Sequence, residues 1–142
     1  MTVEIKTQRA SAEDAAIFLR RALVGNALFS ALTGAVCVVF ARELTRLTGI
    51  APDAIIMGLG VALLVFAALV AWAALRAPDI RPYGRLIFGA DVAWVAISAA
   101  LLVTGLTPLT NAGVWVVILI ADMVAFFALL EYLGLRRLRT AK

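Results

Sequence analysis

Long runs of apolar residues, separated by short polar breaks, fill most of the sequence after residue 21. An α-helix rises about 1.5 Å per residue, so about 20 apolar residues cross the ~30 Å hydrocarbon core of a bilayer. The runs reach this length and predict transmembrane helices at about 22–41, 54–75, 86–106 and 112–133. We therefore predict an all-α, polytopic membrane protein built as an antiparallel bundle of four transmembrane helices.

The polar residues that remain form tails and short connections. We predict a single membrane domain over 1–142, with a cytoplasmic tail at 1–11 and a basic cytoplasmic tail at 134–142. Acidic residues interrupt the sequence before the first apolar run, so we expect that run to be retained and not cleaved as a signal peptide.

Turn and capping residues mark where the helices are expected to begin and end. Ser11 is predicted to cap the first helix, Asp53 the second apolar helix, and Thr110 or Asn111 the last one. Charged and leucine residues alternate after the first apolar run and predict a short interfacial helix that stops at Gly49.

Composition and charge agree with a membrane location. Hydrophobic residues make up 64% of the chain, against about 45–50% in ordinary globular domains. The net charge is +4, but the basic residues lie at the ends of the apolar runs, where membrane orientation accounts for them, so we expect no nucleic-acid partner. Of the 13 Lys and Arg, only Arg42 and Arg46 fall on one predicted side. The positive-inside bias then places both termini and the middle connector in the cytoplasm. We expect the protein to lie in the inner (plasma) membrane.

Missing residue types narrow the chemistry. The chain has no His, and Cys37 is its only Cys. This removes His-ligated haem, most zinc sites, intrachain disulfides and His-activated nucleophiles. No phosphate-binding loop, nucleophile elbow or metal-ligand spacing is present either. We predict no cofactor, no metal site and no enzymatic activity.

A weak internal repeat relates the first and third apolar runs. An offset of 65 positions places Asn26 on Asp91 and Thr33 on Ser98. Two interpretations stay open: a duplication that produced two helical hairpins repeated in parallel, or chance similarity between apolar helices.

Polar residues inside the apolar runs form the candidate intramembrane site, namely Asp122, Asp91, Asn26, Ser98 and Thr33. A carboxylate at the centre of a span costs about 2.5–3.5 kcal/mol on insertion scales, so we expect Asp122 to face the other helices. Asn26 and Asp91 are predicted to share a shallow cytoplasmic layer, and the other three a layer near the bilayer centre. The second run has no charged residue and is expected to face lipid or a partner.

Two interpretations of these carboxyl groups compete. In one, Asp122 and Asp91 hold helices together through hydrogen bonds with neighbouring polar side chains. In the other, they bind and release protons or a small cation. Glu131 lies nine residues from Asp122, half a helical turn out of phase, so the two cannot point at the same axis. We expect Glu131 to reach the interface and pair with Arg76 or Arg136.

Two short segments carry a resemblance to known sequences. They are Asn26-Ala27-Leu28-Phe29-Ser30 with Gly34, and Asp91-Val92-Ala93-Trp94-Val95 with Ser98. With them the chain resembles a set of uncharacterised bacterial four-span integral membrane proteins. The resemblance implies a four-helix fold and implies no activity.

Three functions remain open at this point. The first is a small non-catalytic membrane protein that acts through helix–helix association, as a homo-oligomer or as an accessory subunit of a membrane complex. The second is a transporter or channel component for protons or a small cation that uses the intramembrane Asp residues. The third is binding of a lipid or another hydrophobic ligand between the helices. The expected partners are the lipid bilayer and either a second copy or another membrane protein.

Overall fold

The structure is a computed structural model that describes the helices over residues 2–140 and the side chains over residues 10–140. In this part of the chain all regular structure is helical, as predicted. The helices are α1 (Thr2–Val39), α2 (Ala41–Thr48), α3 (Asp53–Arg76), α4 (Arg81–Thr104) and α5 (Asn111–Thr140). By length and composition α3, α4, α5 and the Ala10–Val39 part of α1 can each cross a membrane. The protein is thus a multi-pass membrane protein with four antiparallel spans.

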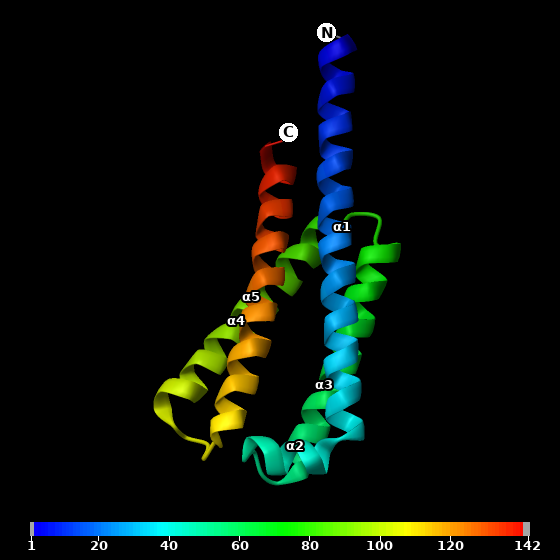
Figure 1. The fold of residues 1–142 in the computed structure, drawn as a ribbon. Coiled ribbons are helices and arrows are strands. Elements are labelled where there is room, and N and C mark those ends of the chain that lie inside the picture. The colour runs from blue at the N-terminus through cyan, green and yellow to red at the C-terminus, as the bar shows by residue number, and fades with distance from the viewer. Residues whose placement is uncertain (1, 141–142) are drawn as a thin grey trace.

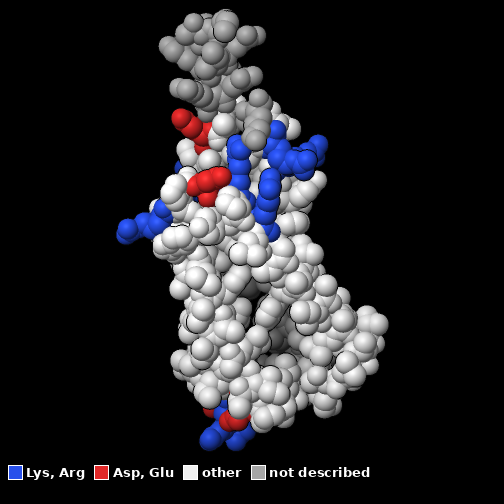
Figure 2. Space-filling view, turned by 180° about the vertical axis from the view of Figure 1, so that it is seen from behind, with Lys and Arg blue, Asp and Glu red and all other residues white. Residues whose placement is uncertain are grey.

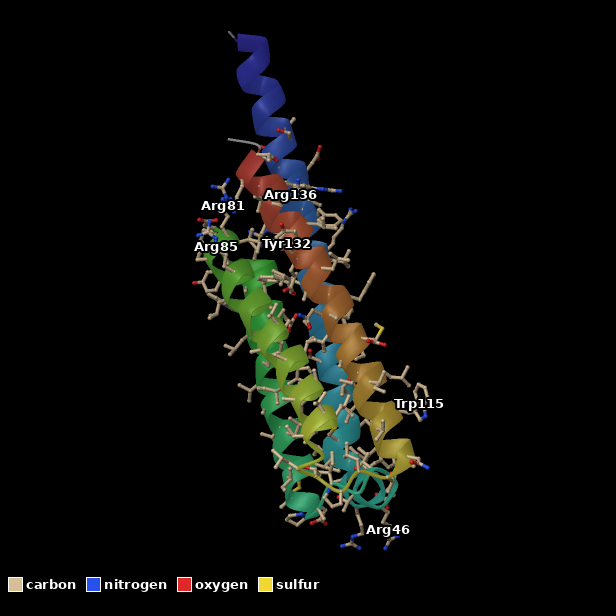
Figure 3. The ribbon with its side chains drawn as sticks, turned by 90° about the vertical axis from the view of Figure 1, so that its left-hand side faces the viewer. Arg46, Arg81, Arg85, Trp115, Tyr132 and Arg136 are labelled. Atoms are coloured by element: carbon tan, nitrogen blue, oxygen red, sulfur yellow. The ribbon has the colours of Figure 1, made fainter. Side chains whose placement is uncertain are left out.

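The four long helices run up and down, and both ends of the chain lie at the same end of the bundle (Figure 1). On the face shown in Figure 2, charged side chains gather at the two ends and a broad uncharged surface separates them. Arg81, Arg85 and Arg136 lie near the end that carries the termini, whereas Arg46 lies at the opposite end (Figure 3). This is the distribution expected for a protein whose middle is surrounded by lipid.

Several helix ends are where the sequence placed them. The short interfacial helix α2 stops at Gly49, whose φ of 83° is the left-handed conformation that glycine adopts without strain. The Thr110 hydroxyl caps α5, because its oxygen accepts a hydrogen bond of 2.9 Å from the Gly113 amide. Two predicted caps are wrong. α1 already runs through Ser11, and Asp53 is the first residue of α3 with no side-chain cap bond.

The helices α1 and α3 form the closest pair, and two glycines allow this. A Cβ atom on Gly60 would lie 2.8 Å from the Gly34 carbonyl oxygen, so only glycine fits at the crossing. The neighbouring Gly58 faces open space and plays no part in this contact. The prediction that the second apolar run faces outward is therefore wrong for one side of α3. That side packs on α1 and includes the fully buried Val70.

At the end of the bundle that carries the termini, an arginine joins α1 to the C-terminal end of α3. Arg20 of α1 donates hydrogen bonds from Nη1 to the Ala74 carbonyl oxygen at 2.5 Å and from Nη2 to the Ala77 carbonyl oxygen at 2.6 Å. Ala74 lies in the last turn of α3 and Ala77 directly follows the helix, where carbonyl groups have no partner within the helix. The guanidinium also offsets the negative end of the helix dipole. Leu19 packs in the same region against Gly84 and Gly134.

The helix α4 has fewer neighbours than the others. It packs mainly on α5 and makes few contacts with α3. Towards its C-terminal end it leans away from α1 and α3 (Figure 1). The bundle is thus closed between α1 and α3 and open between α3 and α4.

Candidate functional site

The centre of the site is Asn26 of α1, which is 1% exposed. Its amide nitrogen Nδ2 donates to Asp91 Oδ2 of α4 at 2.6 Å and to Glu131 Oε1 of α5 at 2.9 Å. The Ser30 hydroxyl, one helical turn further along α1, donates to Asn26 Oδ1 at 3.2 Å. One amide therefore uses both of its hydrogens and its oxygen, and it joins three helices. We call Asn26, Ser30, Asp91 and Glu131 the Asn26 cluster.

Asp91 and Glu131, the carboxyl pair of the Asn26 cluster, lie deep in the protein. Asp91 is 4% exposed and Glu131 is 0% exposed. Within residues 10–140, Asn26 is the only side chain that bonds to either carboxyl group. The second oxygen of Glu131, Oε2, is buried and has no hydrogen-bond partner. A buried polar atom without a partner is unusual, because leaving it unpaired costs about 1–3 kcal/mol.

Charge balance limits the states of the carboxyl pair. Asn26 is neutral, and no arginine of the described part of the chain bonds to Asp91 or Glu131. Two negative charges so close together and so deeply buried are unfavourable without a positive charge. The pair therefore needs at least one proton or one bound cation.

The structure brings two of the predicted site residues into direct contact. Asn26 and Asp91, which the 65-residue offset aligned, bond to each other. Ser98 is buried and Thr33 lies on the wall of a cavity, but in the described structure neither bonds to the Asn26 cluster. Their predicted place in a separate polar layer near the bilayer centre stays a prediction.

Asp122 lies outside the site. Its side chain is exposed, so the prediction that it faces the other helices is wrong for the single chain. Glu131, which was expected at the interface with Arg76 or Arg136, is instead fully buried against Asn26. The half-turn phase difference between the two acidic residues was the available signal. It shows that the two residues lie on opposite sides of α5. The hydrogen bond from Asn26 shows that Glu131 is the one that faces the other helices.

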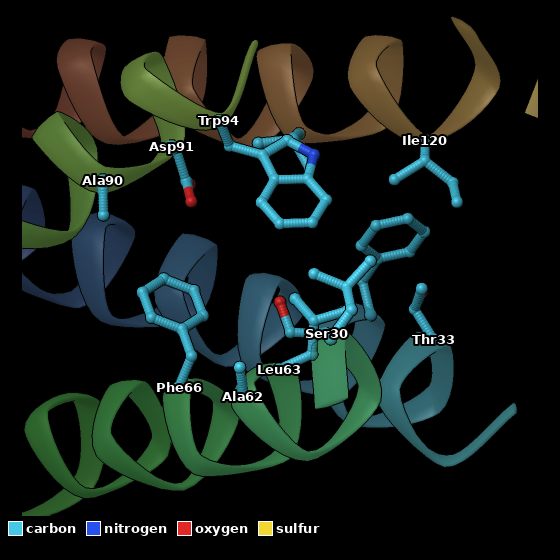
Figure 4. Close-up of a pocket in the computed structure, with 12 residues that line it drawn as sticks. Ser30, Thr33, Ala62, Leu63, Phe66, Ala90, Asp91, Trp94 and Ile120 are labelled. Atoms are coloured by element: carbon cyan, nitrogen blue, oxygen red, sulfur yellow. The ribbon is translucent and has the colours of Figure 1, made fainter. Parts of the chain in front are cut away.

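A cavity of about 200 Å³ lies beside the Asn26 cluster and is lined by residues of all four spanning helices. Asp91 and Trp94 extend into it from α4, and Phe66 faces them from α3 (Figure 4). Ser30 and Thr33 add hydroxyl groups on the side of α1, and most of the remaining wall is apolar. The indole nitrogen Nε1 of Trp94 is buried and has no hydrogen-bond partner. The cavity is thus apolar with a few polar groups, which is typical of a site for a small ligand.

The cavity opens sideways. Ala62 of α3 and Ala90 of α4 both line it, and both are exposed. They lie where α3 and α4 make few contacts, and the surface is hollowed there (Figure 2). A ligand would therefore enter from the lipid side, between α3 and α4.

Metal chemistry has little support at this site. Within the described residues, no group of three His, Cys, Asp or Glu side chains lies close enough to hold a metal ion. The carboxyl pair suits a proton or a singly charged cation better than a divalent metal, which takes more oxygen ligands.

Comparisons with known proteins add no assignment. No protein family, no curated protein and no solved structure matches the chain. The resemblance to bacterial four-span membrane proteins therefore stays a prediction.

Proposed function

We propose that this is a non-catalytic integral membrane protein that acts through helix–helix association. The observation that carries the proposal is the exposed Asp122 at the middle of α5. A carboxyl group at this depth costs about 2.5–3.5 kcal/mol on insertion scales when nothing shields it. Contact with another helix supplies that shield.

The surface around Asp122 has the spacing of a helix-packing seam. Trp115, Leu119, Asp122, Phe126 and Leu129 are all exposed and follow one another at alternating intervals of four and three residues. This is the heptad spacing by which one helix presents a continuous stripe to another. We call these five residues the α5 seam.

The partner that we propose is a second copy of this chain. In a two-fold dimer the same surface meets itself, so Asp122 would lie opposite its counterpart. Two carboxyl groups that share a proton can hydrogen bond, and a single polar residue in an apolar seam sets the register of the pairing. The dimer would sit in the inner (plasma) membrane with both termini in the cytoplasm, which the arginines at that end of the bundle support.

Disulfide cross-linking in native membranes tests this proposal. In a Cys37→Ala background, Leu119→Cys places a thiol on the α5 seam, and Leu69→Cys places one on the outward side of α3. Leu119 and Leu69 are each 62% exposed, so they form a matched pair. We expect oxidation to give a dimer with Leu119→Cys only. Equal dimer from both variants, or dimer from neither, would contradict the proposal. A cross-linked product that contains another protein would keep association but replace the second copy as partner.

The Asn26 cluster favours a second candidate function, a transporter or channel component for protons or a small cation. The supporting observation is the fully buried Glu131 with its unpartnered Oε2. Asp91 and Glu131 would carry the proton or cation, whereas Asp122 would not. Reconstituted vesicles test this with a pH-sensitive dye and with a sodium-sensitive dye. Glu131→Gln should abolish flux and Asp122→Asn should retain it. Absence of flux in the unmodified protein, or equal flux in both variants, would remove this candidate.

A further inference from the structure

We infer that the cavity binds a small organic ammonium ion with an apolar body, which enters from the membrane between α3 and α4. This inference names a ligand class for the carboxyl pair of the second candidate function. It does not depend on association through the α5 seam. The charge, the wall, the size and the opening of the cavity support it.

The charge of the site matches one cation. One proton held by the carboxyl pair leaves one negative charge, and Asp91 lies on the cavity wall. The only group bonded to the pair in the described structure is the neutral Asn26 amide. An ammonium group beside Asp91 would supply the missing positive charge in a place where water does not screen the attraction.

The wall of the cavity suits a weakly hydrated cation with an apolar body. Phe29, Phe66 and Trp94 line the cavity together with Asp91. Aromatic faces attract ammonium groups, and tryptophan is the most effective of them. An inorganic ion such as Na⁺ would lose its hydration shell among these side chains and gain few oxygen ligands in return. An organic ammonium ion loses less hydration and gains contact with the rings.

The size and the opening limit the ligand further. Apolar cavities of about 150 Å³ hold benzene, so a cavity of about 200 Å³ holds one ring with a small head group. The exposed Ala62 and Ala90 at the opening are small and uncharged. A hydrophobic cation that has already partitioned into the bilayer reaches the cavity through this opening and does not cross the charged ends of the bundle.

Calorimetric titration of the purified protein tests the inference. The probe is benzyltrimethylammonium, and its control is neopentylbenzene, which has the same shape and no charge. Heats of transfer into empty micelles are subtracted for both compounds. We expect saturable binding of the cation and at least about tenfold weaker binding of the neutral compound, because a charged contact is lost.

Two variants and one control locate the site. Asp91→Asn keeps the size of the side chain and removes its charge, and we expect it to weaken binding of the cation by about tenfold or more. Ala62→Leu narrows the opening without touching the Asn26 cluster, so it should slow or abolish binding even if Asp91→Asn fails to fold. Asp53→Asn removes an equal charge from an exposed residue outside both the cavity and the α5 seam, and it should leave the affinity unchanged.

Several results would overturn the inference. They are absence of binding by the unmodified protein, equal binding of the neutral compound, and unchanged affinity in both Asp91→Asn and Ala62→Leu. The titration needs no membrane and no gradient, so it separates the inference from the function on which it builds. Binding without flux would remove transport and keep the ligand site, whereas flux of protons without binding would do the reverse.

Discussion

The inward and outward faces of a single helix differ in the contacts that their residues make. On α5, Glu131 is fully buried against Asn26, while Asp122 is exposed among apolar side chains. On α3, Gly60 is pressed against α1, while Gly58 two residues earlier touches nothing. In a membrane both faces are apolar, so hydrophobicity does not separate them. Hydrogen bonds and close backbone contacts distinguish the inward face from the outward face, because lipid supplies neither.

The largest loss of stability is expected for a substitution of Asn26, at the centre of the inward-facing side chains. Asn26→Leu removes the only donor that the described structure gives to Asp91 and Glu131, and it leaves both carboxyl groups buried without a bond. We expect the free energy of unfolding to fall by about 3–5 kcal/mol, as when one partner of a buried polar network is deleted. Reversible unfolding in mixed micelles measures this. Thr104→Val, which removes an exposed hydroxyl bonded within its own helix, serves as the control. A loss below about 1 kcal/mol would show that the Asn26 cluster does not hold the helices together.

The next largest loss of stability is expected for Gly60→Ala, and Gly58→Ala is its matched control. Gly60→Ala puts a methyl group 2.8 Å from the Gly34 carbonyl oxygen and should separate α1 from α3, at a cost of about 1–3 kcal/mol. Gly58→Ala meets open space and should be neutral or stabilising by up to about 1 kcal/mol. Thermal unfolding of both variants in the same detergent measures the difference. Equal melting temperatures would mean that the close contact of α1 with α3 does not stabilise the protein.

The arginine cap is expected to contribute less. Arg20→Met keeps most of the side-chain length and removes the bonds to the last carbonyls of α3, so we expect a loss of about 1–2 kcal/mol. Arg85→Met changes an exposed arginine near the same end and should lie within about 0.5 kcal/mol of the unmodified protein. Hydrogen exchange adds a local measurement. Faster exchange near residues 73–80 is expected only in Arg20→Met, and the same exchange in both variants would argue against the cap.

The smallest effect on the stability of a single chain is expected on the outward side. Asp122→Leu removes no hydrogen bond or ion pair within the described residues, so the stability of the dilute monomer should change by less than about 0.5 kcal/mol. Its effect should appear in the dimer, as a lower yield of the Leu119→Cys disulfide. A strongly destabilised monomer would mean that Asp122 has a partner inside the bundle, and the distinction between the two sides of α5 would be lost.

The arrangement of the spans could be predicted because it depends on local sequence. Runs of about 20 apolar residues have one stable form in a bilayer, and the α2 helix, Gly49 and the Thr110 cap follow from short patterns. The contact of Asn26 with Asp91 agrees with the prediction that the two residues share one layer, which followed from their distance along the helices to the flanking arginines. Whether the underlying similarity is a duplication of two parallel hairpins stays a prediction.

The faces of the helices could not be predicted in the same way. Phase alone shows that Asp122 and Glu131 lie on opposite sides of α5, and it does not show which side meets the other helices. Only the amide of Asn26, on a helix 105 residues earlier in the chain, decides between them. The side of α3 that packs on α1 was missed for a related reason. Its signal is the fit between Gly60 and Gly34, which belongs to two helices at once.

The connection between α3 and α4 sets a limit on how the protein can move. Only residues 77–80 join the two helices, and Arg20 holds the carbonyl oxygen of Ala77. The two helices are therefore held together at this end, which would be the pivot for any change in the angle between them. A small rotation at the pivot displaces the distant end of a 24-residue helix by several times as much as the start. A change of angle at residues 77–80, on the side of the membrane where both termini lie, would therefore alter the width of the gap next to Trp94.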